Sequence, residues 1–178
     1  TTALEGLDIQ GFYGADGSLA QIAESPLSLR GVTVSSDDCE AEWLFVAIPG
    51  LKQHGIRFAH AAIEAGASVV LTDEEGRTKA FERGLGVPVI QVADPRAVVP
   101  VLCANVYASP ATRLTTMAVT GTNGKTTTSY LMRAAIASRY PKASLCGTVE
   151  THVGPISFEA VRTTAEAPVI ARILAATE

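Results

Sequence analysis

Short apolar runs alternate with amphipathic segments in the first part of the chain. Runs rich in β-branched and aromatic residues predict three strands, at 44–48, 68–72 and 88–92. Between the first two runs, apolar side chains recur at Phe58, Ala62 and Ala65, a spacing that is typical of a helix. Strands that are separated by helices predict a parallel α/β layer.

Another helix is expected after the third run. Asp94 is a good N-cap residue and Pro95 suits the first helical position, ahead of apolar positions at Val98, Leu102 and Val106. Pro100 lies beyond the first turn, where a proline removes a hydrogen bond and costs about 3 kcal/mol. We therefore expect this helix to start late or to kink.

The pattern changes at residues 108–113, a small-polar stretch that contains Pro110. Such a stretch predicts a linker, and we divide the chain into domains at 1–109 and 110–178. Downstream of it, the pattern predicts a buried strand, a helix, a short strand and a final helix, at 114–120, 126–139, 143–146 and 167–177.

Composition narrows the classes of protein. The 178 residues are 47% hydrophobic and 18% charged with a formal net charge of −4, which predicts a folded globular protein without a basic nucleic-acid surface. No window approaches the ~18 consecutive apolar residues of a membrane span. Cys39, Cys103 and Cys146 lie far apart without CxxC spacing, so we expect small apolar fillers in a reducing, cytosolic setting.

A glycine-containing turn between a predicted strand and a predicted helix carries the clearest chemistry. Two glycines let successive backbone N–H groups face an anionic oxygen, and the start of a helix adds further donors and a partial positive charge. Lys125 would place a point charge between phosphates, and the Thr126 hydroxyl suits a magnesium ion. The expected nucleotide contacts are Gly121, Thr122, Asn123, Gly124, Lys125, Thr126 and Thr127.

This loop departs from the usual GxxxxGK[ST] pattern, because Val119 stands where that pattern has its first glycine. The alternative interpretation is a glycine-rich turn with an ordinary surface lysine, since Asn123-Gly124 is a good turn pair by itself. The predicted strand before the loop and the predicted helix after it favour phosphate binding.

Residues 120–128, Thr-Gly-Thr-Asn-Gly-Lys-Thr-Thr-Thr, resemble the ATP-binding loop of the Mur ligases, bacterial cell-wall enzymes that add amino acids to a UDP-linked muramoyl peptide. Folylpolyglutamate and cyanophycin synthetases have a similar loop, so the loop alone indicates the superfamily. Residues 42–50, 54–58 and 65–70 are similar to the Mur ligases' N-terminal uridine-nucleotide domain. Residues 147–149 and 163–167 resemble the MurE type, which extends the muramoyl dipeptide to a tripeptide.

The resemblance implies an α/β fold, with a small N-terminal uridine-binding domain followed by the first part of a parallel α/β ATPase domain with a phosphate loop. It implies that ATP and Mg²⁺ activate the carboxylate of UDP-N-acetylmuramoyl dipeptide as an acyl phosphate, which an amino acid then attacks. Such a ligase serves peptidoglycan synthesis, cell shape and division in the bacterial cytoplasm.

The resemblance also implies roles for particular residues. Lys125 would be the catalytic residue and Thr126 the magnesium ligand. The muramoyl-peptide acceptor and the uridine would be contacted by Thr163, Thr164, Val34, Ser36, Leu51, Lys52 and Gln53. Among the histidines, only His54 lies near the expected uridine turn, and no histidine has the spacing of a metal ligand.

The family's carbamylated lysine, second set of magnesium ligands and C-terminal domain would lie beyond Glu178. We therefore expect an N-terminal fragment that forms no amide bond by itself. Two alternatives stay open: a non-catalytic module that binds a uridine nucleotide or a partner protein, and another ligase of the superfamily such as folylpolyglutamate synthetase.

Overall fold

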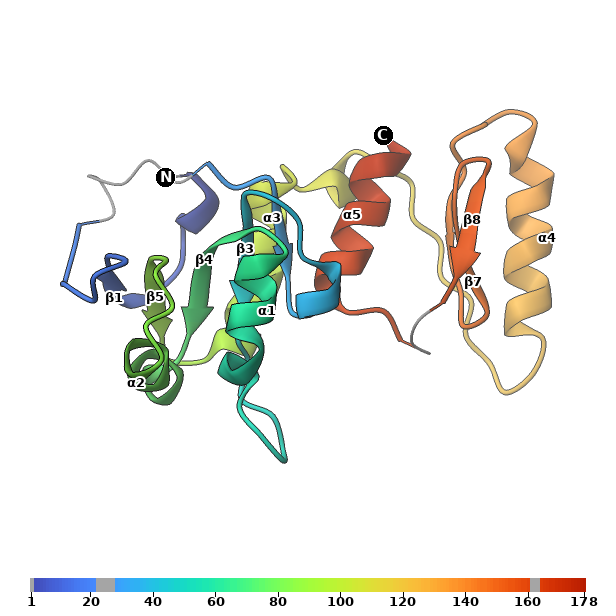
Figure 1. The fold of residues 1–178 in the computed structure, drawn as a ribbon. Helices are drawn as coiled ribbons and strands as arrows, with labels where there is room; N and C mark the ends of the chain where they lie inside the picture. Colours follow the sequence, from blue (N-terminus) through green and yellow to red (C-terminus); the bar gives the residue numbers. More distant parts are fainter. Residues whose placement is uncertain (1, 22–27, 161–163) are drawn as a thin grey trace. The chain divides into compact units, whose positions relative to one another are not determined.

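The computed structural model describes residues 2–21, 28–160 and 164–178 (Figure 1). The chain divides into two compact units, Thr1–Ala108 and Ser109–Glu178. Each unit has its own sheet, so the two are described in turn.

The first unit is built on a five-stranded sheet with the order β1-β5-β4-β3-β2. Strands β2 to β5 are parallel, and β1 pairs with β5 in the antiparallel direction. The strands are β1 (Ile9–Tyr13), β2 (Gly31–Thr33), β3 (Trp43–Val46), β4 (Ala67–Thr72) and β5 (Val89–Val92). The α/β class and the three predicted strands are therefore confirmed.

Helices cover both faces of this sheet (Figure 1). Helices α1 (Ala59–Glu64) and α2 (Glu74–Glu82) pack on one face, and α3 (Pro95–Val106) packs on the other against β2 and β3. All four residues of β3 are buried, as expected for a parallel strand with helices on both sides.

Helix α3 begins at Pro95, so the expected late start is wrong. The Asp94 carboxylate accepts hydrogen bonds from the Arg96 and Ala97 amides at 2.9 and 3.2 Å, which fixes the first turn. The helix continues through Pro100, whose side chain is exposed. Buried apolar residues on the opposite side, Val99 and Leu102 among them, offset the hydrogen bond that Pro100 lacks.

The second unit contains two helices and an antiparallel sheet with the order β6-β7-β8. Its elements are a short 3-10 helix (Pro110–Thr112), α4 (Lys125–Ala137), β6 (Leu145–Cys146), β7 (Glu150–Val153), β8 (Ile156–Glu159) and α5 (Ala167–Thr177). Both predicted helices are confirmed, and the predicted strand at 143–146 is confirmed over its last two residues. No helix in the described ranges is both long and apolar enough to cross a membrane.

The predicted strand at 114–120 is wrong. These residues form no regular structure, and Met117 is 57% exposed. An apolar run becomes a strand only where a neighbouring strand pairs with its backbone, and the described strands of this unit pair only with one another. Cys146 is likewise exposed, contrary to the expectation of a buried filler, whereas Cys39 and Cys103 are buried.

Candidate functional site

The glycine-containing loop 121–127 includes the first three residues of α4. Gly124 is the N-cap of the helix, with a φ of 78°, and Gly121 has a φ of 148°. Both values lie in a region that glycine adopts without the steric cost of a side chain. The N-cap contributes no side-chain hydrogen bond, so the first amides of α4 keep donors for an external acceptor.

The surface of this loop is open. A Cβ atom added at Gly121 would have Asn123 O as its nearest neighbour at 3.7 Å, and one added at Gly124 would meet Thr128 Oγ1 at 4.0 Å. All seven loop residues are exposed. Neither glycine is therefore crowded by neighbouring atoms.

Lys125 folds back over the loop that precedes it. Its Nζ donates to the carbonyl oxygens of Gly121 and Thr122 at 2.6 and 3.4 Å. The positive charge is therefore held beside the loop backbone, next to the free amides of the helix start, and both features attract an anion.

Two side chains of helix α4 attach it to the segments that follow it in the chain. The Tyr130 hydroxyl donates to Glu150 Oε2 at 3.2 Å. Arg133 donates to two backbone carbonyls, to Ala143 through Nε at 3.1 Å and to Gly154 through Nη2. Partial burial, followed by the nearby Glu150 carboxylate, raises the pKa of Tyr130 above its usual value. These contacts fix the helix whose first turn carries the loop.

Thr126 is the second residue of α4 and is exposed. The described residues contain no group of three His, Cys, Asp or Glu side chains that could hold a metal ion. Magnesium prefers oxygen ligands and usually keeps several waters, so one threonine hydroxyl together with phosphate oxygens fits its chemistry.

The expected uridine contacts lie on two loops at one edge of the first sheet. Val34 and Ser36 follow β2, and residues 51–53 follow β3. Because β2 and β3 are parallel neighbours, their carboxyl ends meet at the same edge, which is where ligands bind in open α/β sheets. Val34 and Ser36 are half-buried, whereas Leu51, Lys52 and Gln53 are exposed.

The loop after β3 is a tight turn with an exposed tip. Gly50 N–H donates to Gln53 O at 3.2 Å, and Gly55 N–H donates to Ile48 O at 2.9 Å. A Cβ atom at Gly55 would lie 2.7 Å from Ile48 O, so only glycine fits at the base of the turn. Leu51 projects from the tip and is 109% exposed.

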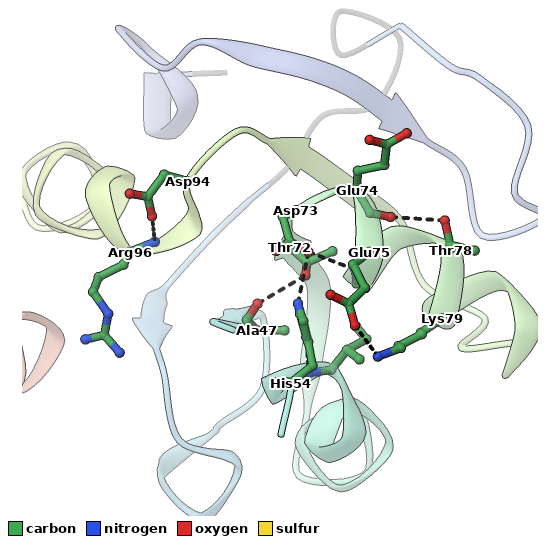
Figure 2. Close-up of polar contacts among 12 residues, drawn as sticks. Ala47, His54, Thr72, Asp73, Glu74, Glu75, Thr78, Lys79, Asp94 and Arg96 are labelled. Carbon is green, nitrogen blue, oxygen red and sulfur yellow. Dashed lines mark hydrogen bonds and ion pairs between the residues drawn. The ribbon is translucent and has the colours of Figure 1, made fainter. Parts of the chain in front are cut away.

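At the end of this turn, His54 forms a hydrogen-bonded pair with Asp73 (Figure 2). His54 Nε2 lies 2.9 Å from Asp73 Oδ1, and His54 Nδ1 accepts the Ile56 amide at 3.1 Å. The same Asp73 oxygen accepts the Gly76 amide at 2.8 Å and caps α2. Sequence reasoning placed His54 near the uridine turn but missed Asp73, whose only sequence signal is that of a possible N-cap.

The remaining expected contacts lie in the second unit. Thr164 is exposed and precedes α5, whereas Thr163 lies outside the described residues. The seven expected nucleotide contacts are consecutive, four in the turn and three in the first turn of α4. The expected uridine contacts share one sheet edge in the first unit.

Family models match most of the chain. The model for the Mur ligase family, catalytic domain, matches residues 28–107, and the model for the Mur ligase middle domain matches residues 119–178. The chain belongs to the Mur ligase family. The two matches cover the loops after β2 and β3 in the first unit and the glycine-containing loop of the second.

Individual relatives agree with this assignment. The UDP-N-acetylmuramoyl-L-alanyl-D-glutamate–2,6-diaminopimelate ligase of Streptomyces coelicolor is 38% identical over 139 residues, which cover 78% of this chain and 27% of that relative. The ligase of the same name from Caldanaerobacter subterraneus is 33% identical over 140 residues, 79% of this chain and 28% of that relative. The chain therefore spans less than a third of the length of these relatives.

Solved Mur ligase structures share the fold. A structure of a UDP-N-acetylmuramoyl-L-alanyl-D-glutamate–2,6-diaminopimelate ligase matches with a TM-score of 0.54 at 25% identity, over 88% of this chain and 30% of that chain. A MurF structure from Acinetobacter baumannii matches with a TM-score of 0.53 at 16% identity, over 98% of this chain and 32% of that chain, and shows the fold alone.

Proposed function

We propose that this chain is the nucleotide-binding part of an ATP-dependent ligase that adds an amino acid to UDP-N-acetylmuramoyl dipeptide in peptidoglycan precursor synthesis. Residues 1–109 would bind the UDP-linked substrate, and residues 110–178 would form the first part of the ATP-binding domain. The observation that carries the proposal is the open loop 121–127, with the Lys125 ammonium held beside free helix amides in a Mur ligase chain. The printed names of the relatives favour 2,6-diaminopimelate as the added amino acid.

The proposed reaction has two steps. A carboxylate oxygen of the dipeptide attacks the γ-phosphorus of ATP, which releases ADP and leaves an acyl phosphate. The amino group of the incoming amino acid then attacks the acyl carbon, loses a proton and expels inorganic phosphate as the amide forms. The proposed enzyme would act in the bacterial cytoplasm.

Residues of the loop would serve the first step by position and charge. Phosphoryl transfer needs positioning and charge neutralisation more than covalent help from the protein. Lys125 and the amides of residues 121–127 would hold the terminal phosphates, and the Thr126 hydroxyl would be a ligand of Mg²⁺. The magnesium ion would neutralise phosphate charge when bound.

The UDP-linked substrate would bind at the loops that follow β2 and β3. Val34, Ser36 and residues 51–53 would contact the uridine part of the substrate. Thr163 and Thr164 would hydrogen-bond the muramoyl peptide. These roles come from the family resemblance, and the shared edge of β2 and β3 supports the first group.

Calorimetric titration with ATP–Mg²⁺ tests the proposal. Lys125→Ala removes a charge-assisted phosphate contact, so we expect ATP affinity to fall by roughly 1.5–3 kcal/mol, about ten- to hundredfold. Lys142→Ala, which removes an exposed lysine of the same unit, is the matched control and should bind ATP like the parent. UDP-N-acetylmuramoyl dipeptide should bind all three proteins equally.

Equal ATP affinity of Lys125→Ala and the parent would contradict the role of the loop. Binding of the UDP-linked substrate without any binding of ATP would favour the alternative of a non-catalytic uridine-nucleotide module.

A further inference from the structure

The tip of the loop after β3, residues 51–53, is exposed and has little to hold it in place. Inside the turn, one backbone hydrogen bond joins Gly50 to Gln53 at 3.2 Å. A loop that must meet a ligand binds more tightly when its bound conformation is already ordered in the free protein. The order of this tip must therefore come from its base.

The base of the turn is held by a buried side chain. His54 is only 9% exposed, and it pairs with Pro49 through an isolated β-bridge that closes the turn. Because His54 Nδ1 accepts the Ile56 amide, the ring proton is on Nε2, which donates to Asp73 Oδ1. The His54 imidazole thus joins the turn after β3 to Asp73, which follows the end of β4.

Asp73 connects this turn to the rigid part of the unit. Its Oδ1 also accepts the Gly76 amide in the first turn of α2, directly after β4. A Cβ atom at Gly76 would lie 2.7 Å from His54 Cε1, so the glycine is what lets the helix and the imidazole approach each other. Thr72 at the end of β4 adds a hydrogen bond from Oγ1 to Ala47 O at 3.1 Å.

We infer that the His54–Asp73 hydrogen bond positions the tip Leu51–Gln53 for a uridine nucleotide, which makes His54 a positioning residue of the uridine site. The inference rests on the proposed function, because it assumes that residues 51–53 contact the UDP-linked substrate. It adds Asp73 and Gly76 to the residues on which that contact depends.

Two substitutions break the link while each keeps the local cap. Asparagine is a good capping residue, so His54→Asn retains an acceptor for the Ile56 amide. Its side chain is too short to reach Asp73. Asp73→Ser retains a cap for α2 but is too short to reach His54. Asp94→Ser is the matched control. Asp94 caps α3 as Asp73 caps α2, and its carboxylate accepts the Arg96 and Ala97 amides rather than a histidine.

The experiment measures UDP affinity by calorimetry and amide hydrogen exchange at Gly50 and Ile56, on the full 178-residue chain. We expect His54→Asn and Asp73→Ser each to weaken UDP binding by about tenfold and to speed exchange at both amides, since a hydrogen bond to a charged group is lost. ATP–Mg²⁺ affinity should stay at the parent value. Asp94→Ser should change neither UDP affinity nor these two amides.

The double variant separates one shared link from two independent losses of stability. Because both substitutions remove the same hydrogen bond, His54→Asn with Asp73→Ser should bind UDP no more weakly than the worse single variant. Additive losses would overturn the inference, as would parent-like UDP affinity in both single variants. If the parent itself failed to bind UDP, the proposed function of the first unit would fall, and exchange at Gly50 would still decide whether the link orders the turn.

Discussion

Individual glycines determine how closely the backbone of this protein approaches other groups. Gly121 and Gly124 have positive φ values in the proposed phosphate loop, and Gly55 and Gly76 sit where a Cβ atom would contact neighbouring atoms. The first two follow from the loop motif. The other two have no sequence signal, because the groups that crowd them come from a separate segment or an earlier turn.

Gly76 allows a test at this scale. Replacing a helical glycine by alanine usually stabilises a protein by about 1 kcal/mol. Here the new Cβ atom would overlap Thr72 Oγ1, and overpacking of this kind costs about 1–3 kcal/mol. We expect Gly76→Ala to lower the free energy of unfolding of the first unit, as measured by chemical denaturation.

Thr72→Ala provides the background that isolates this contact. With the hydroxyl removed, the penalty of Gly76→Ala should shrink. A stabilised Gly76→Ala variant, or a penalty that is unchanged in the Thr72→Ala background, would show that Gly76 is not crowded.

At the scale of elements, the helix that carries the proposed phosphate loop is anchored by a side chain beyond its first turn. Helix α4 shows this arrangement, since Arg133 bonds the carbonyls of Ala143 and Gly154, both of them buried residues. Loss of such a side chain leaves two backbone acceptors without their partner, at a cost of about 1–3 kcal/mol.

We expect Arg133→Met to destabilise α4 and to speed exchange of its amides about tenfold. Arg139→Met, two residues beyond the end of the same helix, makes the same change of charge but removes no such bonds and should alter stability by about 0.5 kcal/mol or less. Equal exchange rates in the two variants would contradict the anchoring role of Arg133.

Some helices and strands could be predicted from the sequence, and others could not. Apolar runs and amphipathic segments are sufficient to predict β3 to β5 and α3 to α5. Helix α4 is predicted from its apolar spacing alone, since none of its residues is buried. Helix α2 was missed, since only Gly76 and Ala80 of its nine residues are buried. The run at 114–120 was assigned to a strand because periodicity records apolar character and not whether a pairing strand exists.

At the scale of the whole molecule, two α/β units of the Mur ligase family each present a loop built on glycine, one after β3 and one before α4. The family could be predicted from the motif at 120–128 and the segments upstream of it. The His54–Asp73 pair could not, because hydrogen bonds between segments depend on the folded chain. The ligand roles of both loops stay predictions.

The central claim is that the loop 121–127 gathers backbone amides and the Lys125 ammonium around a polyphosphate. The most direct measurement is amide hydrogen exchange at residues 122–127 of the parent chain, with and without saturating ATP–Mg²⁺. We expect exchange to slow at these amides, while exchange in the buried strands β3 and β4 stays unchanged. Exchange at residues 122–127 that is the same with bound ATP, or protection confined to another segment, would contradict it.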